Sequence, residues 1–117
     1  MLTSLAFYKA LADEIRLKSL LLILEEGELC VCELLQALNQ DSQPKVSRHL
    51  AQLKKLGMLR DRKQQQWVFY SINPKLADWM LAVLQQTKLH DPTLIQLELQ
   101  RLNSMGERPV RMVACCS

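Results

Sequence analysis

The chain has 117 residues, of which 49% are hydrophobic and 23% charged, so it is long enough for one small globular domain. It has no apolar run long enough to span a membrane, and its N-terminus lacks the basic region and cleavage site of a secretory signal. We therefore expect a cytoplasmic protein without a membrane partner. Its four cysteines are expected to be ligands, sensors or core thiols rather than structural disulfides.

The net charge of +3 is unevenly distributed along the chain. Residues 43–66 contain seven basic residues and one acidic residue, a charge of +6, which leaves −3 for the remainder. A solvated helix face usually mixes its signs, so this basic segment favours a polyanionic partner. A surface that is merely soluble remains the alternative.

Two helices are expected before residue 27. Apolar residues between positions 2 and 11 predict the first helix, and Asp13 is a suitable N-cap for the second. The second helix carries the uninterrupted apolar run 20–24, which is typical of a helix buried on nearly all sides, and Gly27 then ends it. This part of the chain is expected to be core.

Residues 29–56 form the pattern around which the chain is organised. Val31, Leu34, Leu35 and Leu38 recur at helical spacing and predict a helix of about three turns. The polar residues that follow favour caps and turns, so this helix is expected to end before residue 42.

A second helix follows at once, because Ser42 or Gln43 can cap it and Pro44 is tolerated in a first turn. Gly57 is its expected end. Two helices joined by a tight turn, the second with a basic outer face, are typical of a helix-turn-helix whose second helix enters the DNA major groove. The inner face of this second helix consists of Val46, Leu50 and Leu53.

A β-hairpin is predicted directly after this helix. Residues 67–72 alternate in the period-two manner of a strand, and residues 58–62 can pair with them across a tip at 63–66. A basic hairpin at this position is a wing. The predicted fold is therefore mainly α with a β-hairpin, a winged helix-turn-helix. Self-association is expected, because a short chain of thin helices covers little apolar surface.

Cys30 and Cys32 lie in or just before the first turn of the helix that begins the helix-turn-helix. In a regular helix, residues two apart are separated by roughly 200°, so the two thiols are expected to point to opposite sides. They can bind one ion only if the first turn is not ideally helical or unwinds on binding. Soft thiolates select soft centres, whereas structural zinc needs four ligands that this region lacks. Two ordinary buried cysteines remain the alternative.

Two further helices are expected at 74–88 and 92–105. Only Asp78 on the first of them resembles a zinc ligand, and His90 and Asp91 beyond it form no convincing pair. We divide the chain into a domain at residues 1–106 and a flexible tail at residues 107–117, which carries Cys115 and Cys116.

Four stretches carry a family resemblance: ALADEIRL at 10–17, GELCVCEL at 27–34, SQPKVSRHL at 42–50, and RKQ with WVFY within 62–70. They resemble the ArsR/SmtB family of metal- and metalloid-responsive repressors, in particular its arsenite-responsive members. The resemblance implies a homodimeric winged-helix repressor of an arsenic-resistance operon. It also implies that this repressor binds palindromic double-stranded operator DNA, with its first and late helices in the dimer interface.

The resemblance further implies that arsenite or antimonite is the inducer and that Cys30 and Cys32 bind it. Arsenite-responsive relatives often have a third cysteine where this chain has Leu35, so Cys115 and Cys116 are the tentative source of a third sulfur. No enzymatic activity, catalytic residue or catalytic cofactor is expected. The residues expected to contact DNA lie in the second helix and the wing: Gln43, Lys45, Ser47, Arg48, His49, Arg62, Lys63, Gln64 and Gln65.

Three alternatives remain open. A repressor of the same fold that responds to cadmium, lead or thiol oxidation would use the same cysteines. A thiol oxidoreductase or metallochaperone is disfavoured, because the sequence has neither a βαβ pattern nor a second catalytic group near Cys30 and Cys32. A protein-interaction module would show no salt-dependent binding to nucleic acid.

Overall fold

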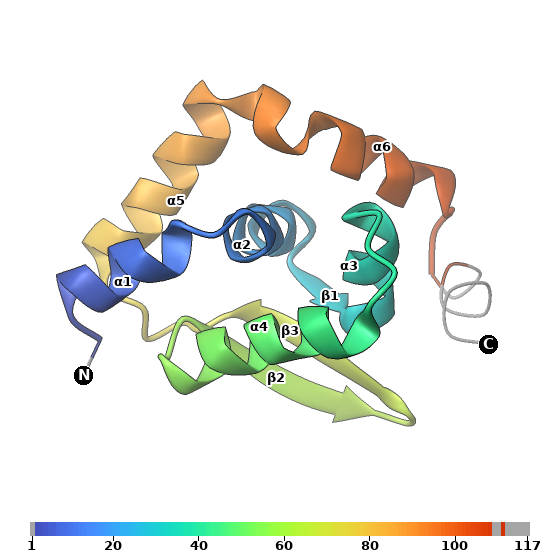
Figure 1. Ribbon diagram of the computed structural model, residues 1–117, viewed down its shortest axis with the longest axis horizontal. Helices are drawn as coiled ribbons and strands as arrows, with labels where there is room; N and C mark the ends of the chain where they lie inside the picture. The colour runs from blue at the N-terminus through green and yellow to red at the C-terminus, as the bar shows by residue number, and fades with distance from the viewer. Residues whose placement is uncertain (1, 109–110, 112–117) are drawn as a thin grey trace.

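The computed structural model describes residues 2–108 and 111 and has the predicted winged helix-turn-helix fold (Figure 1). Within this described part of the chain, every helix is too short or too polar to cross a bilayer. The elements in chain order are α1 (Ser4–Leu11), α2 (Glu14–Glu26), β1 (Glu28–Cys30), α3 (Val31–Ala37), α4 (Gln43–Lys55), β2 (Leu59–Gln64), β3 (Trp67–Ile72), α5 (Asp78–His90), the 3-10 helix η1 (Pro92–Ile95) and α6 (Gln96–Ser104).

The predicted ends of α2 and α4 are confirmed. The side chain of Asp13 caps α2 by accepting a hydrogen bond from the backbone N–H of Arg16 at 3.0 Å. The helix ends at Gly27, whose φ is +91°. The side chain of Ser42 caps α4 by accepting from the N–H of Lys45 at 3.4 Å. Local side-chain chemistry therefore determines where both helices begin.

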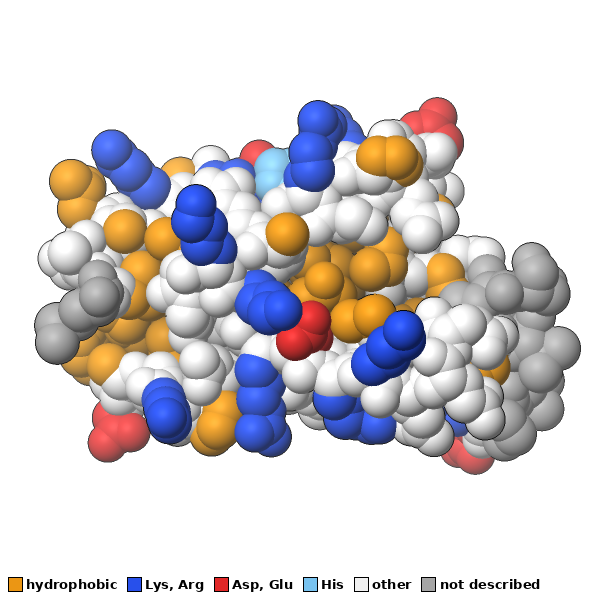
Figure 2. All heavy atoms as spheres, turned by 90° about the horizontal axis from the view of Figure 1, so that it is seen from below, with side chains coloured by type: hydrophobic (Ala, Val, Ile, Leu, Met, Phe, Trp, Pro, Cys, Tyr) orange, Lys and Arg blue, Asp and Glu red, His pale blue; other side chains and the backbone are white. Residues whose placement is uncertain are grey.

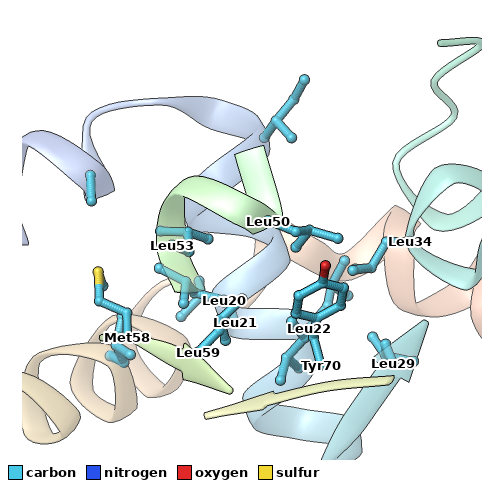
Figure 3. Packing of buried hydrophobic residues seen from close by; sticks show 14 of the residues in the cluster. Leu20, Leu21, Leu22, Leu29, Leu34, Leu50, Leu53, Met58, Leu59 and Tyr70 are labelled. Atoms are coloured by element: carbon cyan, nitrogen blue, oxygen red, sulfur yellow. The ribbon is translucent and has the colours of Figure 1, made fainter. Parts of the chain in front are cut away.

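α3 and α4 form the helix-turn-helix beside the central helix α2. The chain turns between them at Asn39, whose φ of +53° is one that asparagine tolerates. α3 has seven residues instead of the predicted three turns, because the chain up to Cys30 belongs to β1 and the helix already ends at Ala37. The predicted inner face of α4 is confirmed, since its three apolar residues are fully buried and pack in the main core with the leucines of α2 (Figure 3).

β2 and β3 form the predicted wing as an antiparallel hairpin. The predicted tip at residues 63–66 is too wide, because Lys63 and Gln64 still pair with Val68 and Trp67. The turn consists of two residues, and the first, Gln65, has a φ of +56°, which glycine adopts at lower cost. Both strands of the wing therefore extend almost to its tip.

A third strand, β1, is not evident from the sequence pattern. It pairs with β3 in antiparallel register, so the order in the sheet is β1-β3-β2 and the wing strand β3 lies in the middle. Leu29 of β1 is completely buried in the main core. A strand of three residues is too short for an alternating pattern to be recognised in the sequence.

The first late helix begins later than predicted, and the second is divided in two. α5 starts at Asp78 instead of residue 74, because the preceding residues form a turn in which Leu76 N–H donates to the Asn73 carbonyl at 3.0 Å. The single helix predicted at 92–105 is divided into η1 and α6. η1 and α6 lie along the edge of the molecule opposite the wing (Figure 1).

Candidate thiol site and DNA-binding face

The sulfur atoms of Cys30 and Cys32 lie 3.4 Å apart at the start of α3. The predicted orientation to opposite sides is wrong, because Cys30 is the N-cap of α3 and has an extended backbone, with φ −91° and ψ 169°. The rotation of about 100° per residue in a regular helix therefore does not apply between them. The alternative of a first turn that is not ideally helical is confirmed, and the two sulfur atoms lie on the same side without unwinding of α3.

A buried carboxylate holds this turn. Glu33 has no exposed surface and accepts a hydrogen bond from the backbone N–H of Cys30 at 2.9 Å. It also forms ion pairs with Arg108 at 2.7 Å and Arg111 at 3.1 Å. Burial alone would raise the pKa of Glu33, but its hydrogen bonds, led by that from Arg108, outweigh burial and hold the pKa below its ordinary value.

Glu33, Arg108 and Arg111 are site residues that the sequence interpretation missed. A Glu three residues after a helix cap is a sequence signal for a capping box, but the cap is usually Ser or Thr and here it is Cys30. The two arginines are separated from Glu33 by 75 and 78 residues, and no local pattern connects such distant positions. They lie in the segment assigned to a tail, most of which is outside the described residues.

The environment of Cys30 does not favour the thiolate form of its side chain. Only 2% of Cys30 is exposed, and burial raises the pKa of its thiol to about 11, with the charge of Glu33 acting in the same direction. Cys30 is therefore a neutral thiol near pH 7. Catalytic cysteines instead have a lowered pKa and partial exposure. An oxidoreductase with Cys30 as its nucleophile would therefore lack the lowered thiol pKa that this chemistry needs.

The sulfur pair lies on the wing strand β3. Cys30 and Phe69 form a small buried cluster that is separate from the main core. Cys32 and Trp67 pack against this cluster. The thiol site therefore has a direct packing contact with the wing.

The described residues bring two sulfur atoms together but form no complete metal site. Within this part of the chain, no group of three or more His, Cys, Asp and Glu side chains could hold a metal ion. Leu35 is half-buried one turn beyond the sulfur pair, and Asp78 and His90 are both exposed on α5. The tentative ligands Cys115 and Cys116 lie outside the described residues.

The basic segment forms one face of the molecule, built from α4 and the wing. On this face basic side chains are widespread and acidic ones lie mostly at the margin (Figure 2). Gln43, Lys45 and Arg48 are exposed on the first two turns of α4, whereas Ser47 and His49 are half-buried. The accessible residues of this set are suited to contact a polyanion.

His49 of α4 also contacts the start of α2. Its Nδ1 is 3.2 Å from Arg16 Nη1, and its Nε2 is 4.0 Å from Asp13 Oδ1. Burial lowers the pKa of His49, and the opposing charge of Asp13 does not compensate. A contact of His49 with DNA remains a prediction.

The wing residues differ in their partners. Lys63, Gln64 and Gln65 are exposed at or next to the tip. Arg62 is bound instead by the carboxylate of Glu28 in β1, with 2.9 Å between Nε and Oε2, and it donates to Gln64 Oε1 at 2.8 Å. Arg62 is therefore connected to the strand that ends at the thiol site.

Comparison with known proteins identifies the family. Residues 13–61 match the sequence model described as bacterial regulatory protein, arsR family. The arsenic resistance transcriptional regulator ArsR2 of Pseudomonas putida is 51% identical over 116 residues, which cover 99% of this chain and 100% of that protein. The chain belongs to the ArsR family. The resemblance inferred from the sequence is thereby confirmed.

Another relative and two solved structures are similar in sequence or in fold. The arsenical resistance operon repressor of Escherichia coli is 43% identical over 109 residues, covering 91% of this chain and 92% of that protein. Among solved structures, HlyU from Vibrio cholerae has a TM-score of 0.64 at 34% identity and covers 73% of this chain and 87% of its own. The AntR antimony-specific transcriptional repressor shares the fold, with a TM-score of 0.63 at 24% identity over 80% of this chain and 86% of its own.

These relatives are transcriptional regulators, so the expectation that the protein is not an enzyme is confirmed. The protein is an ArsR-family transcriptional repressor, and the helix-turn-helix regulators of this family bind operator DNA.

Proposed function

We propose that this ArsR-family repressor controls an arsenic-resistance operon and leaves its operator when arsenite or antimonite bridges the sulfurs of Cys30 and Cys32. The observation that carries the proposal is the 3.4 Å separation of the two sulfur atoms. The relatives in Pseudomonas putida and Escherichia coli are both named as arsenic-resistance regulators, which supports a metalloid as the inducer.

The spacing of the sulfurs fits a pyramidal trivalent centre. Two sulfurs 3.4 Å apart, each about 2.3 Å from a shared soft atom, subtend an angle of about 95° at that atom. A tetrahedral ion would require about 109° and a wider pair. Arsenite and antimonite retain a lone pair, which compresses the angles between their ligands, and a sulfur spacing of 3.4 Å is compatible with such a centre.

Each arsenic–sulfur bond replaces a hydroxyl of arsenous acid, which takes the thiol proton and leaves as water. The third position of the metalloid is supplied by a tail thiol or by the hydroxyl that remains. Arg108 and Arg111 are anchored on Glu33, whose neighbour in the same turn is Cys30, so the chain leading to Cys115 and Cys116 starts beside the sulfur pair. The division into a domain at 1–106 and a tail at 107–117 belongs to this proposal, with the tail as an optional source of sulfur.

Two copies of the chain are proposed to bind one palindromic operator. Winged-helix dimers place their recognition helices about 34–36 Å apart, in successive major grooves. Exposed apolar residues on α1, α5 and α6 are the proposed dimer contacts, because exposed apolar groups of this size favour burial in an interface. They are Leu5, Tyr8, Trp79, Leu89 and Leu97.

The proposed DNA contacts come from α4 and the wing. Near the start of α4, Gln and Arg side chains are suited to adenine and guanine edges, and the wing supplies phosphate contacts that set register. The full proposed set is Gln43, Lys45, Ser47, Arg48, His49, Arg62, Lys63, Gln64 and Gln65.

The test is release of a labelled promoter fragment from the reduced protein, titrated separately with arsenite, cadmium and peroxide. We expect arsenite to release the fragment from the wild type and not from the Cys30→Ser/Cys32→Ser variant. Serine is a good N-cap, so α3 retains its start in this variant. Cys115→Ser/Cys116→Ser is the matched control. Release by cadmium or peroxide but not by arsenite would contradict the proposal.

A further inference from the structure

The thiol site and the wing share one row of the sheet. Cys30 of β1 lies directly opposite Phe69 of β3, and Phe69 lies directly opposite Arg62 of β2. Residues directly opposite each other in antiparallel strands place their side chains on the same face. The sulfur site, an aromatic ring and a wing cation are therefore consecutive neighbours on one face.

The other face of the sheet belongs to the main core. Leu29, Leu59 and Tyr70 alternate with the residues of that row and are buried in the large cluster beneath the helices. Cys30 and Phe69 are absent from that cluster and form their own. A change at the sulfurs is therefore received first by Phe69 of the wing strand and not by the main core.

Arg62 is held in place by groups that border the thiol site. Its guanidinium lies 4.9 Å from the centre of the Phe69 ring, and Arg108 lies 4.7 Å from the same ring. Glu28 binds Arg62 and is also 3.7 Å from Arg108. Because its side chain is still 51% exposed, Arg62 is at once in contact with this network and accessible to a DNA phosphate.

We propose that capture of the metalloid is transmitted to DNA through the wing, with Arg62 as the positioning residue that connects Phe69 to a phosphate. The proposal rests on the proposed function. Close-packed side chains transmit displacement, because they leave no free volume to absorb an added atom. An atom bound between the sulfurs changes the packing of Cys30 on Phe69, and the guanidinium stacked on that ring moves with it. The helix-turn-helix core need not rearrange.

Two neighbouring substitutions test this route. Arg62→Gln and Lys63→Gln each remove one positive charge from β2, but Lys63 pairs with Val68 and so projects from the opposite face. Each variant is expected to weaken operator binding several-fold and to reduce the salt slope by about one. Only Arg62→Gln is expected to reduce, several-fold, the factor by which arsenite weakens operator binding. Equal arsenite factors in the two variants would overturn the proposal.

Fluorescence gives a readout that does not depend on DNA. The chain has two tryptophans, so the Trp79→Phe variant leaves Trp67, which packs against the sulfur cluster, as the only indole. We expect arsenite to change the emission of Trp67 in this background, with and without Arg62→Gln, because both variants retain the thiols. Unchanged Trp67 emission in protein that has bound arsenite would also overturn the proposal.

These outcomes are distinct from failure of the proposed function. If arsenite does not bind to the wild type or does not release its operator, the proposed inducer is wrong. If the wild type binds arsenite and releases DNA while Arg62→Gln and Lys63→Gln respond alike, only the route through the wing is wrong.

Discussion

The DNA-binding face and the thiol site are built in opposite ways. The face comes from one continuous segment, a helix and the hairpin after it, and most of its proposed DNA contacts are exposed side chains. The thiol site combines β1, the first turn of α3, the wing strand and two arginines 75 and 78 residues beyond Glu33. A single substitution on an exposed surface with many contacts removes only part of the binding energy. In a buried network, the loss of one residue leaves its partners without their hydrogen bonds or counter-charges. The two sites should therefore respond differently to substitution.

The largest expected effect is at the buried carboxylate. Glu33→Ala removes the nearer counter-charge of Arg108 and of the buried Arg111, which keep Glu28 at 3.7 Å and Glu26 at 3.5 Å, respectively, and it leaves Cys30 N–H without its acceptor. We expect the free energy of unfolding to fall by about 3 kcal/mol, measured by urea unfolding of the reduced protein. The exposed Glu107→Ala is the control and should change it by about 0.5 kcal/mol or less. Equal effects of the two variants would refute the view that Glu33 supports the site.

The corresponding change on the DNA-binding face should affect binding and not stability. Arg48→Gln removes an exposed cation from α4, and we expect operator binding to weaken by about 2 kcal/mol, roughly 30-fold. Arsenite binding should be unchanged. Lys88→Gln removes the same charge from α5 and serves as the control. A loss of arsenite affinity in Arg48→Gln would show that the two sites are less separate than their construction indicates.

Acid should weaken the thiol site selectively. Because the pKa of Glu33 is held below its ordinary value of 4.5, its ionised form stabilises the folded protein at neutral pH. That contribution disappears as the pH falls through the folded-state pKa. The stability advantage of the wild type over Glu33→Gln should therefore shrink between pH 7 and pH 3 in urea unfolding. An advantage that stays constant over this interval would contradict the assignment.

The smallest expected effect is a change in stability at the tip of the wing. Gln65→Gly relieves a φ of +56° and should stabilise the protein by about 1 kcal/mol or less, seen as a higher thermal midpoint. Gln66→Gly, at a position without a positive φ, should give no gain. Arsenite affinity should not change in either variant, and a change would mean that the tip influences the sulfur pair directly.

The two sites also differ in how far the sequence predicts them. Helix periodicity and the caps Asp13 and Ser42 are local signals. They are therefore sufficient to predict α2, α4 and the buried side of α4. The strand β1 could not be predicted, because three residues carry no recognisable period. The missed strand also explains the wrong orientation predicted for Cys30 and Cys32. Cys30 ends β1 and caps α3, so the rotation of a regular helix does not apply to it.

The contacts of the thiol site lie beyond any local pattern. The pairing of Glu33 with Arg108 and Arg111 joins positions far apart in the chain, and the packing of Cys30 on Phe69 depends on the register of the unpredicted strand. What the sequence provides is the chemistry of two thiols at this position. The fold provides their separation and their contact with the wing.

The most direct test of the central claim is arsenic X-ray absorption on the reduced, arsenite-loaded protein. We expect at least two sulfurs at about 2.3 Å from arsenic in the wild type, a count that requires Cys30 and Cys32. The Cys30→Ser/Cys32→Ser variant should lose them, whereas Cys115→Ser/Cys116→Ser should retain two. The same number of arsenic–sulfur bonds in the wild type and in Cys30→Ser/Cys32→Ser would contradict the account.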